Sequence, residues 1–591
     1  MINNKTFFKQ ILITLVISTI FSSSTFGIYP SRIAMAAENY TRVTTSRDGV
    51  LKYEKGTLQT TRYGQVQGKL VNDDKILSWT GIPYAKAPVG YLRWKAPQDP
   101  EKFSETFDAT KTANIGVQLS GDKVIGSEDC LNLNIYRPNS DEKDLPVLVY
   151  IHGGNNQTGT SLELSANNLA IAANCVVVSI NYRLGALGFN NLPALKTGNV
   201  YEDSGNYTLL DISKSLDWIK NNINAFGGNS NNITAAGFSA GGRDVMAMLI
   251  SPIFEGKFQK AISFSGGMTI ADSEDSTKVI AKAIAPLVVE DKVKSTEEQA
   301  YRWLLTDDVE VKDYLYGLSA ERLSTLMGNA SIRMSVFPHL YNDGVVLPKK
   351  GFETKNYNNV PLIMLTGSNE FSLFAKADPY FAGLSDETLL NDPEKNAEIK
   401  FASGYGSKMY EYFNAEDSAN RMIEKYTAPI YTCDIKWGTN KEIVGENMAE
   451  LCGSWHGVFL PFLTGEISGI SANYKEAFDN DGVKDLSDKF TKYISNFIWT
   501  SNPNGNDLVE WKPWTKENNG PTQLLFDADK SKAIIKMSYD HTSYEEIIEE
   551  IENDTTVSEK VKRKLIEEVL NGRWFSSALD KYFNNPDLWE K

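Results

Sequence analysis

The segment Gly237-Phe238-Ser239-Ala240-Gly241 decides the fold. It matches G-x-S-x-G, the nucleophile elbow, in which a serine sits on a sharp turn between a strand and a helix. The motif alone is weak, but its flanks predict a strand over 233–236 and a helix over 245–250. Glycines beside the serine let other backbone approach closely, and the helix N-terminus presents N–H groups near Ser239. The segment therefore predicts an exposed nucleophilic serine; the alternative is a glycine-bounded turn that merely begins a helix.

Short apolar runs around this motif predict a sheet that is covered on both faces. Residues 147–151, 176–180, 260–265 and 362–365 are rich in apolar residues without strict alternation, as expected for buried parallel strands. Helical patterns lie between them, and strands that alternate with helices indicate a mostly parallel sheet flanked by helices.

The clearest helical pattern spans residues 211–226. Its apolar residues recur at steps of four and three, which places them on one face; they are Ile212, Leu216, Ile219, Ile223 and Phe226. Asp211 is a candidate N-cap, and Gly227-Gly228 is a stop signal. The pattern therefore predicts one amphipathic helix packed on the sheet.

A serine hydroxyl needs a general base, and the base needs an orienting acid. The chain has four histidines. In the fold that uses this elbow the order along the chain is Ser, acid, His, so His152 is excluded, and His541 lies in a polar stretch near the charged tail. His339 and His456 remain, and the glycine-bounded loop around His456 favours it over His339.

An oxyanion-binding loop is expected after the strand at 147–151. His152-Gly153-Gly154 follows that strand directly and can aim backbone N–H groups at a developing negative charge. With the N–H of Ala240, such a loop would form an oxyanion hole. A His-Gly-Gly turn is common on its own, so its weight comes from its place in this order.

These features together resemble the type-B carboxylesterase and cholinesterase family of the α/β-hydrolase fold, over about residues 57–526. Further segments carry the resemblance: Gly81-Ile82-Pro83-Tyr84-Ala85, Ser127-Glu128-Asp129-Cys130-Leu131-Asn132-Leu133-Asn134, Asn181-Tyr182-Arg183-Leu184-Gly185, Ala225-Phe226-Gly227-Gly228-Asn229 and Asp343-Gly344-Val345-Val346-Leu347-Pro348. The resemblance implies hydrolysis of carboxylic esters through an acyl-enzyme, without a metal or organic cofactor.

The resemblance also implies roles for individual residues. It implies Ser239 as nucleophile, Glu370 as the triad acid and His456 as the base. The oxyanion donors that it implies are the backbone N–H groups of Gly154, Asn155 and Ala240. A lipase-like or thioesterase-like acyl hydrolase, and a binding protein of the same fold without catalysis, are the alternative functions.

Four departures from the family's pattern bear on the substrate. Phe238 stands where most members carry Glu, which argues against specialisation for cationic choline esters. Asp244 either replaces that lost carboxylate in part or forms an ion pair with Arg243. Asn155 replaces a glycine and narrows the pocket while keeping a backbone donor. The Cys that usually pairs with the equivalent of Cys130 is absent, so that disulfide cannot form.

The N-terminus predicts export. Residues 1–36 contain Lys5 and Lys9, a short apolar run and Ala34-Met35-Ala36, which is the pattern of a cleavable signal peptide cut after Ala36. The alternative is an uncleaved N-terminal anchor. Cleavage leaves 555 of the 591 residues, and since it removes three basic and no acidic residues it changes the net charge from −15 to −18. The expected divisions are the signal at 1–36, a hydrolase domain at 37–540 and a C-terminal helical extension at 541–591.

Composition limits the partners. A strongly acidic chain is a poor nucleic-acid binder, and no stretch beyond the signal is long and apolar enough to cross a bilayer. Four cysteines are too few for a disulfide scaffold; Cys175 is expected to be a buried thiol, and Cys433 and Cys452 could pair. The expected partner is a small ester substrate outside the cytoplasm.

Overall fold

The structure is a computed structural model that describes residues 51–586 except residues 113, 327–331 and 334–335. The predicted signal at 1–36 lies outside these described residues. Among the helices of the described part, none is long and apolar enough to cross a membrane.

An eleven-stranded sheet forms the centre of the molecule, in the order β16-β15-β14-β13-β12-β11-β9-β10-β8-β4-β3. Neighbouring strands from β15 to β10 are parallel, and the pairings at both edges of the sheet are antiparallel. The predicted mostly parallel sheet is therefore confirmed. The strands are β3 (Lys69–Val71), β4 (Ile76–Pro83), β8 (Asn132–Pro138), β9 (Leu145–Ile151), β10 (Val176–Ile180), β11 (Gly228–Phe238), β12 (Lys260–Phe264), β13 (Leu362–Gly367), β14 (Ile430–Ile435), β15 (Gln523–Ala528) and β16 (Ala533–Met537).

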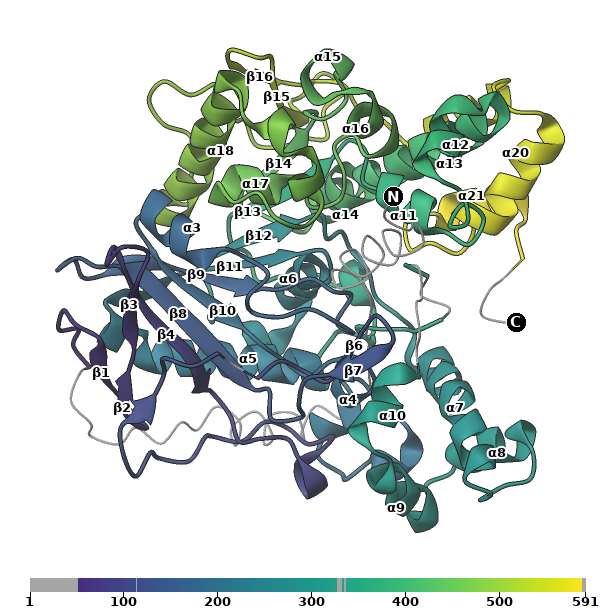
Figure 1. Ribbon diagram of the computed structural model, residues 1–591. Coiled ribbons are helices and arrows are strands. Elements are labelled where there is room, and N and C mark those ends of the chain that lie inside the picture. The colour runs from purple at the N-terminus through teal and green to yellow at the C-terminus, as the bar shows by residue number, and fades with distance from the viewer. Residues whose placement is uncertain (1–50, 113, 327–331, 334–335, 587–591) are drawn as a thin grey trace.

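Two apolar cores, one on each face, explain why the central strands are continuously apolar. In β9, Val147 and Val149 point into one core, whereas Leu148 and Tyr150 point into the other. The first core is completed by α5 (Tyr207–Asn222), α6 (Ala240–Ile250) and α7 (Ser273–Glu290). The second is completed by α3 (Ala166–Ala172), α13 (Pro393–Tyr412) and α18 (Asp481–Thr500). In the view of Figure 1, α5 and α7 lie below the strands and α13 and α18 lie above them.

The helix predicted at 211–226 begins earlier than expected. It is α5, which continues as a 3-10 turn over Ile223–Phe226 and ends at Gly227 in the left-handed conformation (φ 76°). The predicted N-cap role of Asp211 is wrong. Asp211 lies within α5 and not at its start. Its carboxylate accepts hydrogen bonds of 2.6 and 2.8 Å from the guanidinium of Arg183. Asp211 is fully buried, so its charge requires this partner.

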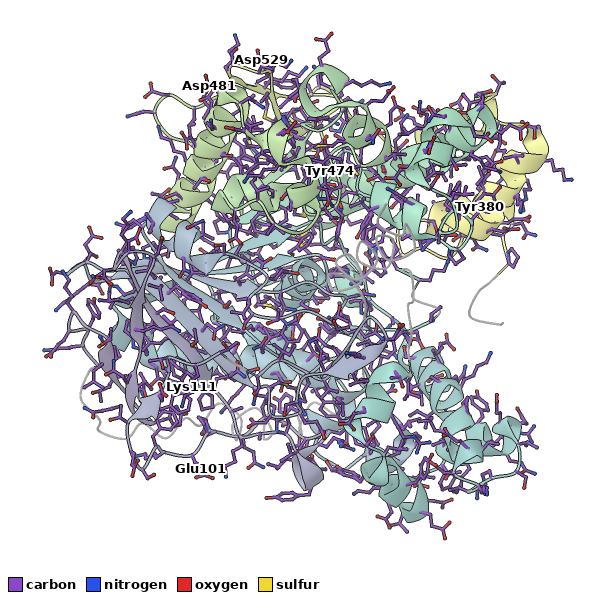
Figure 2. The ribbon with its side chains drawn as sticks, viewed as in Figure 1. Glu101, Lys111, Tyr380, Tyr474, Asp481 and Asp529 are labelled. Atoms are coloured by element: carbon purple, nitrogen blue, oxygen red, sulfur yellow. The ribbon has the colours of Figure 1, made fainter. Side chains whose placement is uncertain are left out.

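The C-terminal extension is helical, as predicted, and it packs on the body of the molecule. It contains α19 (Tyr544–Asn553), α20 (Glu559–Leu565), a π-helical turn (Ile566–Leu570) and α21 (Ser577–Phe583). Its buried apolar residues belong to the second core. Figure 1 shows its yellow helices beside α11 (Ser372–Ala377), α12 (Asp386–Asn391) and α13. In Figure 2 Tyr380 lies beside these helices, and Lys564 Nζ is 4.7 Å from the centre of its ring.

The cysteines form no disulfide among themselves. All four lie within the described residues, and each is buried and free, which confirms the prediction for Cys175. Cys433 and Cys452 do not pair. The thiol of Cys452 lies 3.2 Å from the hydroxyl of Tyr474 instead.

The buried Arg183–Asp211 ion pair generates a stability prediction. Replacing Asp211 with Ala leaves a buried guanidinium without its carboxylate, so we expect the free energy of unfolding to fall by about 3–5 kcal/mol. Glu101 forms an exposed pair with Lys86, so Glu101→Ala is the matched control and should change stability little. Denaturant unfolding of the two variants measures the difference. Equal losses in both variants would contradict the account of the Asp211 pair.

Candidate active site

Four parallel strands end at one edge of the sheet, and the candidate site lies there. Their last residues are in register: Gly237 of β11 pairs with Ile151 of β9, and Phe238 pairs with Phe264 of β12. β12 in turn pairs with β13 up to Leu365. Because parallel strands share a C-terminal edge, residues far apart in sequence are brought together here.

Ser239 occupies the turn between β11 and α6, as the motif predicts. Its backbone has a φ of 56° and a ψ of −114°, a conformation that non-glycine residues rarely adopt. Its N–H donates to the carbonyl of Phe264 (2.8 Å), and its own carbonyl accepts from the N–H of Arg243 (2.9 Å). A Cβ on Gly237 would lie 2.2 Å from the Gly241 oxygen, and one on Gly241 would lie 2.1 Å from the Ile151 oxygen. Only glycine fits at either position.

Glu370 and His456, 86 residues apart, meet at this edge. Glu370 follows β13, and His456 lies in the loop between α16 (Glu446–Leu451) and α17 (Phe459–Thr464). The imidazole Nδ1 of His456 is hydrogen-bonded to Oε2 of Glu370. The other carboxylate oxygen accepts from the Ser265 hydroxyl (2.5 Å) and from the Gly367 N–H (2.7 Å). Glu370 is fully buried, so these donors replace the water that its charge would otherwise require.

The hydrogen bond expected between Ser239 and His456 is not made in this structure. Ser239 Oγ and His456 Nε2 are both buried, and neither has a hydrogen-bond partner. The residue before Ser239 does contact the imidazole: the ring of Phe238 lies 4.8 Å, centre to centre, from that of His456. Hydrogen bonds between nucleophile and base are often long without substrate and shorten in the reacting complex.

The loop after β9 contains a run of residues in the left-handed backbone conformation. Gly154, Asn155 and Asn156 all have positive φ angles, of 90°, 51° and 57°. The carbonyl of Gly154 accepts from the N–H groups of residues 157 and 158 (both 2.9 Å). A Cβ on Gly241 would also lie 2.7 Å from the His152 oxygen, so the first turn of α6 lies against the start of this loop.

The side chain of His152 packs against Tyr182 and against the start of this loop. Its ring stacks on Tyr182 at 4.3 Å, and its Nδ1 lies 2.7 Å from the Gly153 carbonyl. Burial lowers the pKa of His152 to about 4, so the ring is neutral at pH 7. The N–H of Gly153 donates to Glu163 (2.9 Å), and burial raises the pKa of Glu163 to about 7.

The expected ion pair between Arg243 and Asp244 is wrong. The Arg243 guanidinium is hydrogen-bonded to the Asn155 side-chain oxygen and to His339 Nε2, and it lies 3.9 Å from the Trp574 ring centre. Asp244 instead accepts from the Asn156 amide (3.0 Å), and burial raises its pKa to about 7.

A cavity of about 290 Å³ adjoins His456. Phe238, Trp455 and Leu460 give it apolar surface, and Glu163, Glu466 and several serine and threonine residues line the rest. The sequence did not predict this cavity. Of its lining residues, Phe238 was singled out only as a departure from the family's pattern, and His456 only as the candidate base. Ser265 was also missed, although a Ser-Gly-Gly segment directly after β12 was a usable signal.

Comparison with known proteins identifies the family. The sequence profile of the carboxylesterase family matches residues 55–442. The chain belongs to this family. It is 30% identical to para-nitrobenzyl esterase of Bacillus subtilis over 494 residues, which cover 80% of this chain and 94% of that protein. It is also 30% identical to cocaine esterase of Homo sapiens, covering 78% and 86% of the two chains.

Solved structures agree with this membership. A structure of a PNB esterase aligns with 83% of this chain and 99% of its own, with a TM-score of 0.63 and 27% identity. A thermophilic PNB esterase aligns with a TM-score of 0.61 and 26% identity, over 81% of this chain and 97% of its own. This carboxylesterase therefore has the α/β-hydrolase fold and hydrolyses carboxylic esters as a serine hydrolase.

The raised pKa of Glu163 generates a pH prediction. Its carboxyl group has a pKa of about 7 in the folded protein and an ordinary value of 4.5 when exposed, so the folded state binds more protons between these values. The stability that it contributes therefore falls as pH rises from about 4.5 to about 7. Glu163→Gln removes this dependence, so its melting temperature relative to the wild type should rise between pH 5 and pH 8.

The comparison with the wild type cancels the pH-dependent contributions of the other buried carboxyl groups to stability, because both proteins contain these groups. Glu101→Gln, at an exposed position, is the control and should show no such trend. A difference in melting temperature that is the same at pH 5 and pH 8 for Glu163→Gln would contradict the assignment.

Proposed function

We propose that Ser239 is the nucleophile of this esterase, that His456 is its general base and acid, and that Glu370 orients His456. The observation that carries the proposal is the hydrogen bond from His456 Nδ1 to buried Glu370, at the sheet edge that also holds the strained turn of Ser239. A carboxylate on Nδ1 fixes the imidazole tautomer that leaves Nε2 free to accept the serine proton.

The reaction then proceeds in two steps. Ser239 Oγ attacks the ester carbonyl as Nε2 of His456 takes its proton, and the resulting imidazolium is stabilised by Glu370. The backbone N–H groups of Gly154, Asn155 and Ala240 stabilise the oxyanion, a contribution of about 3 kcal/mol per donor in other hydrolases. His456 returns the proton to the departing alkoxide, and a water that it activates then releases the acid.

The leaving alcohol is assigned to the cavity beside His456, because the group that protonates the alkoxide must face it. The apolar walls at Phe238, Trp455 and Leu460 favour an apolar, uncharged alcohol. The names of the relatives, a para-nitrobenzyl esterase and a cocaine esterase, agree with an aromatic or bulky ester partner. We propose neutral esters with an apolar alcohol as the substrate class.

Replacement of the three proposed residues tests the assignment. We expect Ser239→Ala and His456→Ala to lower kcat for p-nitrophenyl acetate by at least about 10³-fold, and Glu370→Gln by about 10²–10⁴-fold, because the imidazole loses its orientation. A fluorophosphonate probe should label Ser239 in the wild type and fail to label Ser239→Ala.

The chain offers a matched control for this experiment. His541 also has its Nδ1 hydrogen-bonded to a carboxylate, that of Glu416 at 2.6 Å, but it lies outside the candidate site. His541→Gln should leave kcat within about twofold of the wild type. Full activity in Ser239→Ala, or equal losses in His541→Gln and His456→Ala, would exclude the proposed triad.

We further propose that the enzyme is exported and acts outside the cytoplasm. The support is the sequence pattern of residues 1–36, a basic start, a short apolar run and the small residues at 34–36. N-terminal sequencing of protein recovered from the extracytoplasmic fraction of an expressing cell should begin at Ala37. Recovery of the protein only from the cytoplasm with residue 1 intact would contradict this.

A further inference from the structure

The segment that carries Glu370 and the loop that carries His456 are joined by more than the hydrogen bond between those two side chains. Residues 368–372, the acid segment, follow β13 and contain Glu370. Residues 452–457, the histidine loop, lie between α16 and α17 and contain His456. Further hydrogen bonds connect the acid segment with the histidine loop on both sides of Glu370.

Asn369, the residue before Glu370, forms a reciprocal pair of hydrogen bonds with Ser454, two residues before His456. The backbone N–H of Asn369 donates to the carbonyl of Ser454 (3.1 Å). The side-chain Oδ1 of Asn369 accepts from the backbone N–H of Ser454 (3.0 Å). Ser454 is fully buried, so its N–H needs an acceptor from within the protein. The amide of Asn369 supplies that acceptor and ties the backbone of the histidine loop to the acid segment.

The start of the histidine loop is fastened to the acid segment as well. The hydroxyl of Ser372, two residues after Glu370, donates to the carbonyl of Cys452 (2.7 Å). The next residue, Gly453, has a φ of 55°, and a Cβ there would lie 2.3 Å from Oδ1 of Asn369. A side chain at position 453 would therefore displace the Asn369 amide. The close fit of the two segments depends on the glycine as well as on the hydrogen bonds.

The position of the His456 ring depends on these contacts, because one end of the ring is not held. Its Nε2 has no hydrogen-bond partner among the described residues, and its Nδ1 is bonded to Glu370. The aromatic rings around it make apolar contacts, which are non-directional; they are Phe238, Phe374 and Tyr410. Directional contacts therefore come from the Glu370 carboxylate and from the hydrogen bonds that hold the histidine loop.

We propose that Asn369 is a positioning residue for ester hydrolysis, because its amide holds the histidine loop in register with Glu370. Without this acceptor the buried N–H of Ser454 is unsatisfied, and the loop shifts until that group finds another partner. His456 shifts with the loop, and a misplacement of about 1 Å can lower a catalysed rate about 10²-fold. The inference rests on the proposed roles of Glu370 and His456.

Asn369→Leu and Asn369→Asp test this role, since both new side chains have a shape close to that of asparagine and only the carboxylate keeps an acceptor at Oδ1. We expect Asn369→Leu to lower kcat for p-nitrophenyl acetate by about 10–100-fold. KM should stay within about threefold, because Asn369 does not line the cavity beside His456. Asn369→Asp should keep kcat within about threefold of the wild type. Each kcat is taken from the plateau of that variant's pH profile, so that the added charge does not enter the comparison.

Asn222→Leu is the matched control. Oδ1 of Asn222 accepts from the backbone N–H of Arg62 (2.8 Å), 160 positions away, and Asn222 is fully buried. It lies at the end of α5, which leads into the start of β11, whereas Ser239 follows the end of that strand. This variant loses the same kind of long-range hydrogen bond, and its kcat should stay within about twofold of the wild type.

All rates are expressed per Ser239 labelled by a fluorophosphonate at completion, which removes the contribution of unfolded protein. Equal losses of this rate in Asn222→Leu and Asn369→Leu would overturn the role of Asn369. Should Asn369→Leu fail to fold, Asn369→Ala also lacks the acceptor and supplies the same comparison, with the same expected direction.

The Glu370→Gln background separates positioning from general structural support. The imidazole already lacks its carboxylate there, so adding Asn369→Leu should lower kcat further by no more than about threefold. The same large loss in both backgrounds would show that Asn369 acts independently of the Glu370–His456 pair, and would overturn the proposal.

The two levels of the account fail in distinguishable ways. Wild-type kcat in Asn369→Leu, beside a Glu370→Gln variant that shows its expected loss, would overturn the role of Asn369 and leave the triad intact. Wild-type kcat in Glu370→Gln would overturn the triad, and the role of Asn369 with it.

Discussion

The tight turn at Ser239 is the constraint on which the rest of the site depends. Its backbone conformation is one that a non-glycine residue holds only when its surroundings enforce it. The enforcement comes from the neighbouring glycines, which bring the first turn of α6 against the ends of β11 and β9. The strand order, the position of α6 and the loop after β9 are therefore parts of one packing arrangement.

The polar groups at this edge are buried, and their partners compensate for the lost water. Glu370 satisfies its carboxylate with the Ser265 hydroxyl, a backbone N–H and the His456 ring. Aromatic rings of Phe238, Phe374 and Tyr410 enclose that imidazole at 4.8 to 5.7 Å. In such low-polarity surroundings a hydrogen bond to a charged group is stronger than in water, which suits the imidazolium that the proposed mechanism requires.

Much of this arrangement was predictable from sequence, and the exceptions have a common cause. The elbow, the parallel sheet and the His456 loop follow from local pattern and chain order. Asp211 was mistaken for a helix cap because its partner, Arg183, lies 28 positions earlier in the chain. The Arg243–Asp244 ion pair failed for the same reason: the contacts of Arg243 come from Asn155, His339 and Trp574. Local sequence shows which residues are polar, whereas distant elements decide their partners.

A crystal structure of the enzyme bound covalently to a phosphonate ester tests the central claim most directly, because the adduct mimics the tetrahedral intermediate. The account predicts phosphorus bonded to Ser239 Oγ and His456 Nε2 within hydrogen-bonding distance of an adduct oxygen. It also predicts the phosphonyl oxygen at about 2.7–3.1 Å from the N–H groups of Gly154, Asn155 and Ala240. An adduct on another residue, or a phosphonyl oxygen directed away from these three N–H groups, would contradict it.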